Sequence, residues 1–252
     1  MAVNGRLYLV PAPLDFGCAE QAPLQDAVPL GTLQVAARLS HWICENAKST
    51  RAYLKRIDGV VPLATPLQQQ VMTELPREVH KKGDHGPGFD ATPLLAAALQ
   101  GHDIGLVSEA GMPAVADPGS SVVRAAHALG VAVVPLVGPS ALLLALAASG
   151  LNGQNFAFVG YLPQDAEARS ERVRQLEALA LKTGQTQLCI ETPYRTETLR
   201  RALVQTLQHN TRLAIATGLT LDQANILSRT VKVWRQHAEP LPDVPAVFAI
   251  GR

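Results

Sequence analysis

The segment Val107-Ser108-Glu109-Ala110-Gly111-Met112-Pro113-Ala114-Val115-Ala116-Asp117-Pro118-Gly119 links an apolar run to a helical run through a long loop rich in glycine and proline. The apolar run 104–107 predicts a strand, and a helical pattern begins near Ser120. In open α/β sheets, ligands bind at the carboxyl ends of strands, in the crevice that such turns form. Glycine lets a backbone approach a ligand closely, and proline fixes the shape of the loop. The segment therefore predicts a ligand-binding turn.

A second loop of this kind, 137–141, follows the apolar run 131–136 and also leads into a helix. Two shaped loops in succession predict a small-molecule pocket built largely from main chain. No G-x-G-x-x-G follows a predicted strand and no G-x-x-x-x-G-K-[ST] occurs in the chain. These absences disfavour a Rossmann-type nicotinamide enzyme and a P-loop nucleotidase.

Composition and charge narrow the class of protein. The 252 residues allow one large domain or two domains, and 47% hydrophobic residues can form a full core. Lys plus Arg number 22 and Asp plus Glu number 21, which argues against a strongly basic nucleic-acid binder but leaves room for a local patch. Aromatic residues make up only 4%, so a base-stacking surface for single strands is not favoured.

The cysteines and the apolar stretches bear on the compartment. Cys18, Cys44 and Cys189 are far apart and odd in number, which predicts buried, reduced thiols in a cytoplasmic protein. The first residues lack the regions of a signal peptide. The longest apolar stretch, 141–148, is too short for a membrane span, which needs about 20 residues. No membrane association is expected.

The order of apolar and helical runs predicts the fold class. Strands are predicted at 7–10, 41–44, 104–107 and 131–136, and then at 155–161, 186–190, 213–217, 227–231 and 247–250. The βαβ order of the first series implies parallel pairing with right-handed crossovers, whereas the second series alternates more and predicts mixed pairing. We therefore expect an α/β protein with two αβα domains. Residues 1–137 would carry a mainly parallel sheet and residues 138–252 a mixed sheet.

Five motifs, in order along nearly the whole chain, resemble those of the tetrapyrrole-methylase superfamily, the class III S-adenosylmethionine-dependent methyltransferases. The motifs are Leu-Tyr-Leu-Val-Pro-Ala-Pro at 7–13, the loop 108–119, Gly-Pro-Ser-Ala at 138–141 with Ser-Gly-Leu at 149–151, Phe-Ala-Phe-Val-Gly-Tyr-Leu-Pro at 156–163, and Glu-Thr-Pro-Tyr-Arg at 191–195. They are most similar to the branch that contains the ribosomal RNA small-subunit 2′-O-ribose cytidine methyltransferase.

This resemblance implies S-adenosylmethionine in a cleft between two αβα domains, with the N-terminal domain carrying cofactor and substrate loops and the C-terminal domain completing the cleft. It also implies a homodimer. The residues that it assigns to the cofactor are Pro11, Leu14, Ser108, Glu109, Ala110, Gly111, Met112, Ser140, Ala141, Glu191, Thr217 and Pro245.

Of five segments that depart from the pattern of the RNA-methylating branch, three lie at 45–48, 217–221 and 244–245. Residues 45–48 read Glu-Asn-Ala-Lys where the branch has Glu-Asp-Thr-Arg, and residues 217–221 read Thr-Gly-Leu-Thr-Leu where it has Arg-Glu-Leu-Thr-Lys. Val244-Pro245 stands where the branch has Gly-Glu. The cofactor loops match better than the substrate-side groups, which indicates a diverged paralogue.

A hydroxyl substrate would need a general base to accept its proton. Candidate bases are Glu45, Glu191, His80 and His85. Glu45 and Glu191 each follow a predicted strand and are the predicted catalytic residues. The alternative is that each carboxylate caps a helix or pairs with a neighbouring cation, Arg51 or Arg195.

Substrate contacts are predicted at Lys48, Arg51, His80 and Arg195, with a solvated helix face as the alternative for the cations. The polar region 78–89 predicts a loop that acts as a lid or contacts RNA. Its two histidines have no third ligand at a suitable spacing, so no metal site is expected.

Two acidic residues of the loop 108–119 have competing roles. Glu109 is either a cofactor ligand or a group that orients its own loop. Asp117 is expected to form a turn and cap the following helix.

The expected function is methyl transfer from S-adenosylmethionine to RNA, with the ribose 2′-O of ribosomal RNA as the leading target. Two alternatives stay open: a non-catalytic paralogue that keeps the cofactor pocket, and a methylase of a small tetrapyrrole-like substrate.

Overall fold

A computed structural model describes residues 4–82, 84, 88–237 and 239–252. The chain divides into two compact units. The first unit runs to Gly17 and resumes over Ala22–Pro139, and the second combines Cys18–Gln21 with Ser140–Arg252. The short excursion into the second unit is fixed in part by Gln223, whose side-chain amide donates to Glu20 over 3.4 Å. Sequence analysis did not predict this excursion.

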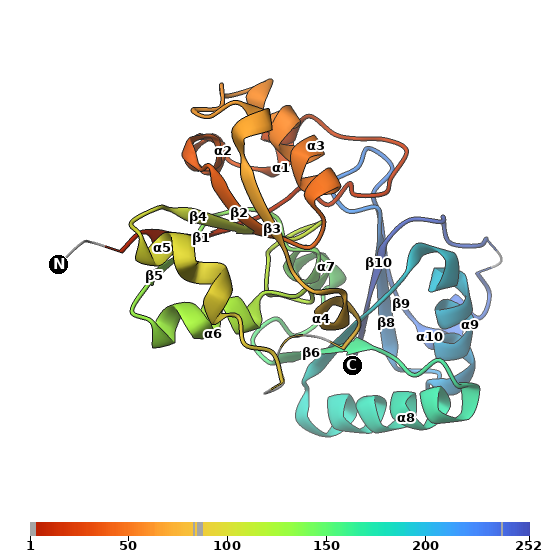
Figure 1. Ribbon diagram of the computed structural model, residues 1–252. Helices are drawn as coiled ribbons and strands as arrows, with labels where there is room; N and C mark the ends of the chain where they lie inside the picture. The colour runs from red at the N-terminus through yellow and green to blue at the C-terminus, as the bar shows by residue number, and fades with distance from the viewer. Residues whose placement is uncertain (1–3, 83, 85–87, 238) are drawn as a thin grey trace. The chain divides into compact units, whose positions relative to one another are not determined.

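The first unit is built on an all-parallel sheet of five strands in the order β3-β2-β4-β1-β5 (Figure 1). The strands are β1 (Arg6–Val10), β2 (His41–Cys44), β3 (Val71–Glu74), β4 (Ile104–Val107) and β5 (Ala132–Pro135). β4 is buried at every position, as expected for a central strand covered on both faces. The parallel pairing predicted for this half of the chain is confirmed.

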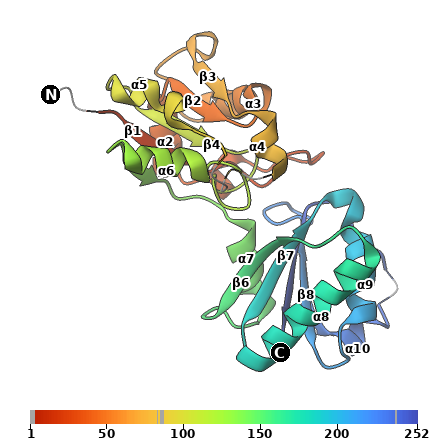
Figure 2. The same cartoon turned by 60° about the horizontal axis from the view of Figure 1, so that its bottom comes forward.

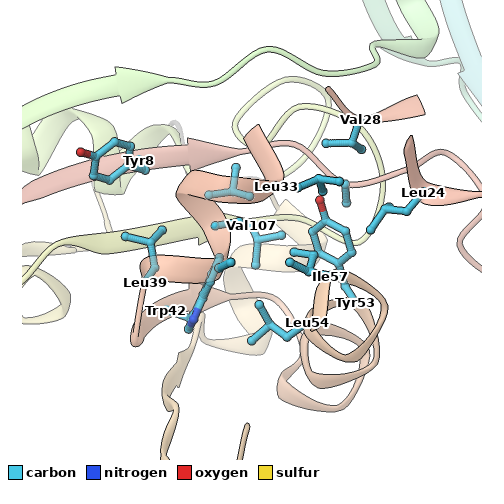
Figure 3. Packing of buried hydrophobic residues seen from close by; sticks show 14 of the residues in the cluster. Tyr8, Leu24, Val28, Leu33, Leu39, Trp42, Tyr53, Leu54, Ile57 and Val107 are labelled. Carbon is cyan, nitrogen blue, oxygen red and sulfur yellow. The ribbon is translucent and has the colours of Figure 1, made fainter. Parts of the chain in front are cut away.

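Helices cover both faces of this sheet. They are α1 (Leu24–Ala27), α2 (Leu30–Arg38), α3 (Ala47–Asp58), α4 (Arg77–Lys82), α5 (Ala96–Leu99) and α6 (Ser120–Ala128), with 3₁₀ helices η1 (Leu67–Gln69) and η2 (Thr92–Leu95). Leu24, Leu33 and Leu54 pack with Trp42 on one face, and Figure 3 shows their side chains converging there. Residues of η2, α5 and α6 form the core on the other face.

The strand order creates a switch point between β4 and β1. From β1 the chain continues to β2, on one side, whereas from β4 it continues to β5, on the other side. Right-handed crossovers then place the two connections on opposite faces of the sheet. The loops that leave β1 and β4 therefore diverge, and a crevice between them is the usual ligand position in such sheets.

The second unit has a mixed sheet in the order β6-β7-β10-β8-β9, in which β6 and β7 are parallel and the other pairs antiparallel (Figure 2). Its strands are β6 (Phe156–Tyr161), β7 (Thr186–Glu191), β8 (Arg212–Thr217), β9 (Asn225–Thr230) and β10 (Ala246–Gly251). Mixed pairing was predicted for this half, and it is confirmed.

The helices of the second unit are α7 (Ala141–Ser149), α8 (Ala166–Thr183), α9 (Thr196–Thr206) and α10 (Val231–Trp234), with η3 (Pro193–Arg195). α8, α9 and α10 cover one face, around the buried Phe248 and Trp234. α7 covers the other face, where Leu142 and Leu146 pack against β8 and β10. The two sheets with their helices confirm the predicted α/β class.

Four local expectations were wrong. β3 is a strand where none was predicted. It lies at the sheet edge, and all of its side chains except the partly buried Met72 are exposed, so it lacks an apolar pattern. The polar region 78–89 begins as helix α4 rather than as a loop, and residues 83 and 85–87, including His85, lie outside the described part of the chain. Cys18 is partly exposed, although Cys44 and Cys189 are buried as predicted.

The fourth error concerns the start of α6. Gly119 is its N-cap residue, and the backbone N–H groups of Gly119 and Ser121 donate to Asp84 rather than to the predicted cap, Asp117. The carboxylate of Asp84 takes that role from a distant part of the chain. It accepts the backbone N–H groups of Gly119 and Ser121, each over 2.8 Å. The hydroxyls of Ser120 and Ser121 donate to the same carboxylate.

Candidate active site

The loops that follow β1 and β4 are joined by main-chain hydrogen bonds. Ala12 donates to Gly111 over 2.9 Å, and Gly111 donates to Ala12 over 3.0 Å. Gly111 has φ +72°, a conformation that favours glycine, and a Cβ at this position would lie 3.3 Å from Cδ2 of Leu14. Two segments about 100 residues apart in sequence thereby form one rigid element at the switch point.

Side chains fix the backbone on either side of this element. The hydroxyl of Tyr53, on α3, donates to the carbonyl of Pro11 over 2.7 Å. The hydroxyl of Thr32, on α2, donates to the carbonyl of Val137 over 2.7 Å. Gly138 passes so close to Pro11 that a Cβ would lie 2.2 Å from its Cγ. The loops after β1, β4 and β5 are therefore closely packed and held in one arrangement.

An ion pair holds the far part of the first loop. Arg56, on α3, donates through two nitrogens to the buried carboxylate of Asp15, over 2.9 and 2.8 Å. The same guanidinium donates to the carbonyl of Ala22 over 2.9 Å. Bidentate Arg–carboxylate pairs are among the stronger charged hydrogen bonds. Arg56 is thus committed to the loop after β1.

Carboxylates gather where β2 and β4 end. Glu45 accepts the backbone N–H of Glu109 over 3.4 Å, and Glu109 accepts the hydroxyl of Ser49 over 3.1 Å. Burial, together with the negative charges of Glu45 and Glu109, raises the pKa of Asp117 to about 7, although a hydrogen bond from Ser108 lowers it in part. Asp117 therefore titrates near neutral pH, unlike an exposed aspartate.

α3 begins at this same edge. Its N-cap residue, Asn46, accepts the backbone N–H of Lys48 over 2.8 Å and that of Ser49 over 3.3 Å. Lys48, Arg51 and Lys55 are exposed, and their spacing of three and four residues places them along one side of the helix. None of the three takes part in an ion pair among the described residues.

In the second unit, predicted site residues gather at one edge of the sheet. Ala246, the first residue of β10, pairs with Glu191 at the end of β7 and with Thr217 at the end of β8. Pro245 precedes it, and its carbonyl accepts the backbone N–H of Gly218 over 3.2 Å. The structure therefore places Glu191, Thr217 and Pro245 at one edge of the second sheet.

Glu191 is buried and ion-paired. Arg195 lies 3.1 Å from its carboxylate, and the backbone N–H of Thr192 donates to the same carboxylate over 2.9 Å. This pairing is the alternative that sequence analysis named for Glu191. Burial, and the charge of Glu191, raise the pKa of Cys189 to about 12, so this thiol stays protonated and is no nucleophile.

The other predicted site residues lie on different elements of the two units. Ser140 is the N-cap residue of α7 without a side-chain cap bond, and Ala141 is the first residue of that helix. Met112 is half-buried in the loop after β4. His80 belongs to α4, and its side chain is outside the described atoms.

Three functional features escaped the sequence argument: the Asp84 cap, the Asp15–Arg56 pair and the raised pKa of Asp117. Each depends on residues 30 or more positions apart. Within the described ranges, no group of three or more His, Cys, Asp or Glu side chains has the arrangement of a metal site. No helix in those ranges combines the length and the apolarity that crossing a membrane requires.

Comparison with known families and structures agrees with this geometry. The family model described as Tetrapyrrole (Corrin/Porphyrin) Methylases matches residues 32–233. The crystal structure of the methyltransferase CobJ resembles this one with a TM-score of 0.59 at 17% identity, covering 98% of this chain and 94% of that chain. Uroporphyrin-III-C-methyltransferase from Thermus thermophilus gives a TM-score of 0.52 at 18% identity, with the same coverage. These two likenesses show the fold.

Relatives with curated names share more sequence. The protein named ribosomal RNA small subunit methyltransferase I of Mesorhizobium japonicum is 31% identical over 247 residues, which covers 97% of this chain and 74% of that protein. The Bacillus subtilis protein of the same name is 29% identical over 236 residues, covering 92% and 71%. With the Escherichia coli O157:H7 protein of that name, 41% identity extends over 95 residues, 38% of this chain and 33% of the relative. The matches support an S-adenosylmethionine-dependent methyltransferase, and they show that this chain belongs to the tetrapyrrole methylase family.

Proposed function

We propose that this protein transfers a methyl group from S-adenosylmethionine to ribosomal RNA, at a ribose 2′ hydroxyl. The observation that carries the proposal is the joined pair of loops at Ala12 and Gly111, at the switch point of the first sheet. The relatives named for ribosomal RNA supply the substrate class.

The residues of the first unit suit this cofactor. S-adenosylmethionine carries a cationic sulfonium and a cationic ammonium group, and carboxylates stabilise such charges. Glu45 and Glu109 place carboxylates beside the loop after β4. Main-chain atoms of 108–113, together with Pro11 and Leu14, supply the close walls that the glycine at 111 permits. Glu191, Thr217, Pro245, Ser140 and Ala141 remain predicted cofactor contacts of the second unit.

The cofactor supplies an activated methyl group, so the protein must align the nucleophile, exclude water and accept one proton. Glu45 is the proposed proton acceptor, because it lies at the end of β2 and contacts the loop after β4 through Glu109 N–H. Glu191 is tied to Arg195, so we assign this pair to positioning rather than to proton transfer.

The exposed cations of α3 are the proposed RNA contacts. Lys48 and Arg51 stand at the start of the helix, beside Glu45, and Lys55 continues the same side. Phosphate contacts of this kind position RNA without reading its sequence. Replacing Lys48 and Arg51 by glutamine should weaken RNA binding and leave cofactor binding unchanged.

The cofactor site is tested by calorimetric titration with S-adenosylhomocysteine. A Gly111→Trp variant should lose micromolar binding, because the indole would fill the space next to Leu14. Gly153→Trp is the matched control, since a Cβ added at this glycine of the second unit would meet no atom within 4 Å. If Gly111→Trp still binds S-adenosylhomocysteine, the cofactor site does not include this loop.

The substrate is tested in a deletion strain by mass spectrometry of ribosomal RNA nucleosides. Loss of one 2′-O-methylated nucleotide, restored by the gene, is the expected result, and an unchanged set would contradict it. Cofactor binding without transfer to any cellular fraction would favour a non-catalytic paralogue, and a spectral shift on porphyrinoid titration would favour a tetrapyrrole substrate. The proposal includes a cytoplasmic homodimer, which sedimentation analysis can test.

A further inference from the structure

A cluster of basic side chains surrounds the short helix α10 in the second unit. We call it the α10 basic cluster, and its members are His209, Arg229, Lys232, Arg235 and His237. β8 and β9 form an antiparallel hairpin, and the cluster lies at the end where Leu213 pairs with Arg229. The predicted site residue Thr217 pairs with Asn225 at the opposite end.

Arg229 is held in place without a carboxylate. Its guanidinium carbon lies 5.7 Å from the centre of the Trp234 ring. One of its nitrogens lies 3.4 Å from Nδ1 of His237, whose ring makes an edge contact with the same tryptophan. Trp234 is itself buried and donates its indole N–H to the carbonyl of Leu213 over 2.7 Å. The arginine therefore stacks on a rigid platform.

Arg235, just after α10, is held by backbone carbonyl groups. Its guanidinium donates to the carbonyl of Val204 over 3.2 Å and to that of Leu207 over 3.3 Å, and it also contacts His209. The backbone N–H of Lys232 donates to the carbonyl of His209 over 2.9 Å, which ties α10 to the same loop. Lys232 and Arg235 are exposed.

No carboxylate forms an ion pair with these cations among the described residues. Elsewhere in the second unit, arginines are neutralised by carboxylates: Arg195 pairs with Glu191, and both Arg200 and Arg201 pair with Glu197. No residue of the α10 basic cluster takes part in an ion pair within the described parts of the chain. An ordered guanidinium has already lost much of its side-chain entropy, so binding an anion costs less.

We propose that the α10 basic cluster is a second RNA-contacting surface, which binds phosphates of the RNA backbone away from the reacting nucleotide. This inference rests on the proposed RNA substrate. Guanidinium groups match phosphate oxygens through paired hydrogen bonds, and a stacked arginine presents its edge for such bonds. The chain as a whole is nearly neutral, with 22 basic and 21 acidic residues, so such a local concentration of positive charge is what RNA contact requires.

The distance between the α10 basic cluster and the predicted site residue Thr217 indicates what the cluster does. Four residue steps along β8 separate Thr217 from Leu213, the partner of Arg229, which corresponds to roughly 13 Å at strand spacing. A single nucleotide at the site cannot reach that far, whereas a folded RNA segment can. The cluster should therefore govern affinity for long RNA and leave the handling of the cofactor and of a short substrate unchanged.

The test is the salt dependence of binding to ribosomal small-subunit RNA, with a double variant Arg229→Gln/Lys232→Gln. On the order of tenfold weaker binding is expected, and the slope of log K against log salt should fall by about 1 to 2. The control variant Arg172→Gln/Arg174→Gln removes the same charge from exposed positions on α8. It should bind RNA as the unaltered protein does.

A Lys232→Glu variant separates charge from folding, because this side chain is exposed and its ammonium forms no ion pair among the described residues. It should weaken RNA binding without changing the melting temperature or the affinity for S-adenosylhomocysteine. RNA binding and methyl transfer that persist unchanged in both cluster variants would overturn the inference and leave the proposed function standing. Failure of the unaltered protein to bind RNA would overturn both.

Discussion

Gly111 and Ala12 exchange two main-chain hydrogen bonds, of 3.0 and 2.9 Å, although the strands that precede them run parallel. The pairing beyond the strands is antiparallel, so the chain after β4 must turn back within four residues to reach Ala12. The positive φ of Gly111 makes that reversal feasible. This contact converts two flexible turns into a single element, and the stability of the loops around it can be tested.

Replacing Arg56 by alanine should loosen the loop after β1. The change removes the bidentate pair with Asp15 and the bond to Ala22, and it leaves a buried carboxylate without its cation. We expect a loss of about 2–4 kcal/mol in the free energy of unfolding, measured by urea titration. Affinity for S-adenosylhomocysteine should fall as well. Lys55→Ala, the exposed neighbour, is the control, and an equal effect of both substitutions would contradict the prediction.

Replacing Asp84 by asparagine should destabilise the start of α6. The carboxylate accepts from Gly119, Ser120 and Ser121, and the amide nitrogen of asparagine cannot accept these bonds. The expected cost is about 2 kcal/mol at pH 7, by thermal or urea unfolding. Asp90→Asn tests the specificity of the effect, because Asp90 is exposed and receives its backbone bond from Thr92 alone.

The Asp84 effect should also depend on pH. Burial opposes the charged form, but hydrogen bonds from Ser121, Ser120 and Gly119 outweigh it and hold the pKa of Asp84 below its usual value. A lowered pKa contributes stability above the unfolded value, about 4, and the contribution disappears as pH falls through the folded value. The difference between the unaltered protein and Asp84→Asn should therefore shrink below about pH 4. A constant difference would refute the role of the ionised carboxylate.

Asp117 should show the opposite pH dependence. Burial, assisted by Glu45, raises its pKa to about 7, so the folded protein keeps this proton while the unfolded chain loses it above about pH 4. Stability should therefore decrease as pH rises from about 4 to 7. Asp117→Asn removes the titration and should gain about 1–2 kcal/mol relative to the unaltered protein at pH 8, a figure reduced for partial exposure. Unfolding curves at pH 5 and pH 8 measure the gain.

In the second unit, Glu177 should hold the turn between α9 and β8. Its buried carboxylate accepts the backbone N–H of Gln208 over 2.8 Å and the hydroxyl of Thr211 over 2.5 Å. Glu177→Ala leaves both donors unsatisfied, and a loss of about 2–4 kcal/mol in the free energy of unfolding is expected. Glu171→Ala, at an exposed position of the same helix, should change stability by less than about 0.5 kcal/mol. Similar losses at both positions would contradict the role of the buried bonds, because alanine favours a helix at least as well as glutamate.

Local sequence patterns predicted the parts of the fold that depend on neighbouring residues. The short runs at 41–44 and 104–107 coincide with β2 and β4, because a central parallel strand is covered on both faces and is therefore poor in polar side chains. The edge strand β3 has exposed side chains and no such signal, so it was missed.

The motifs likewise gave the family and the two loops, and the pairing of Glu191 with Arg195 was one of the alternatives named for Glu191. The predicted cofactor and catalytic roles of these residues stay predictions, since each concerns a ligand rather than the fold. The functional roles predicted for the domains 1–137 and 138–252 also stay predictions.

The sequence by itself determined the order of strands and helices, the shaped loops and the family, because these follow from periodicity, glycine and proline placement, and short motifs. Only the tertiary structure decided that Asp84 caps α6, that Arg56 pairs with Asp15, and that Arg229 stacks on Trp234. The reason is physical: the first two contacts join residues more than 30 positions apart, and the third depends on how β9 and α10 pack. Such contacts exist only once the sheets have brought their loops together.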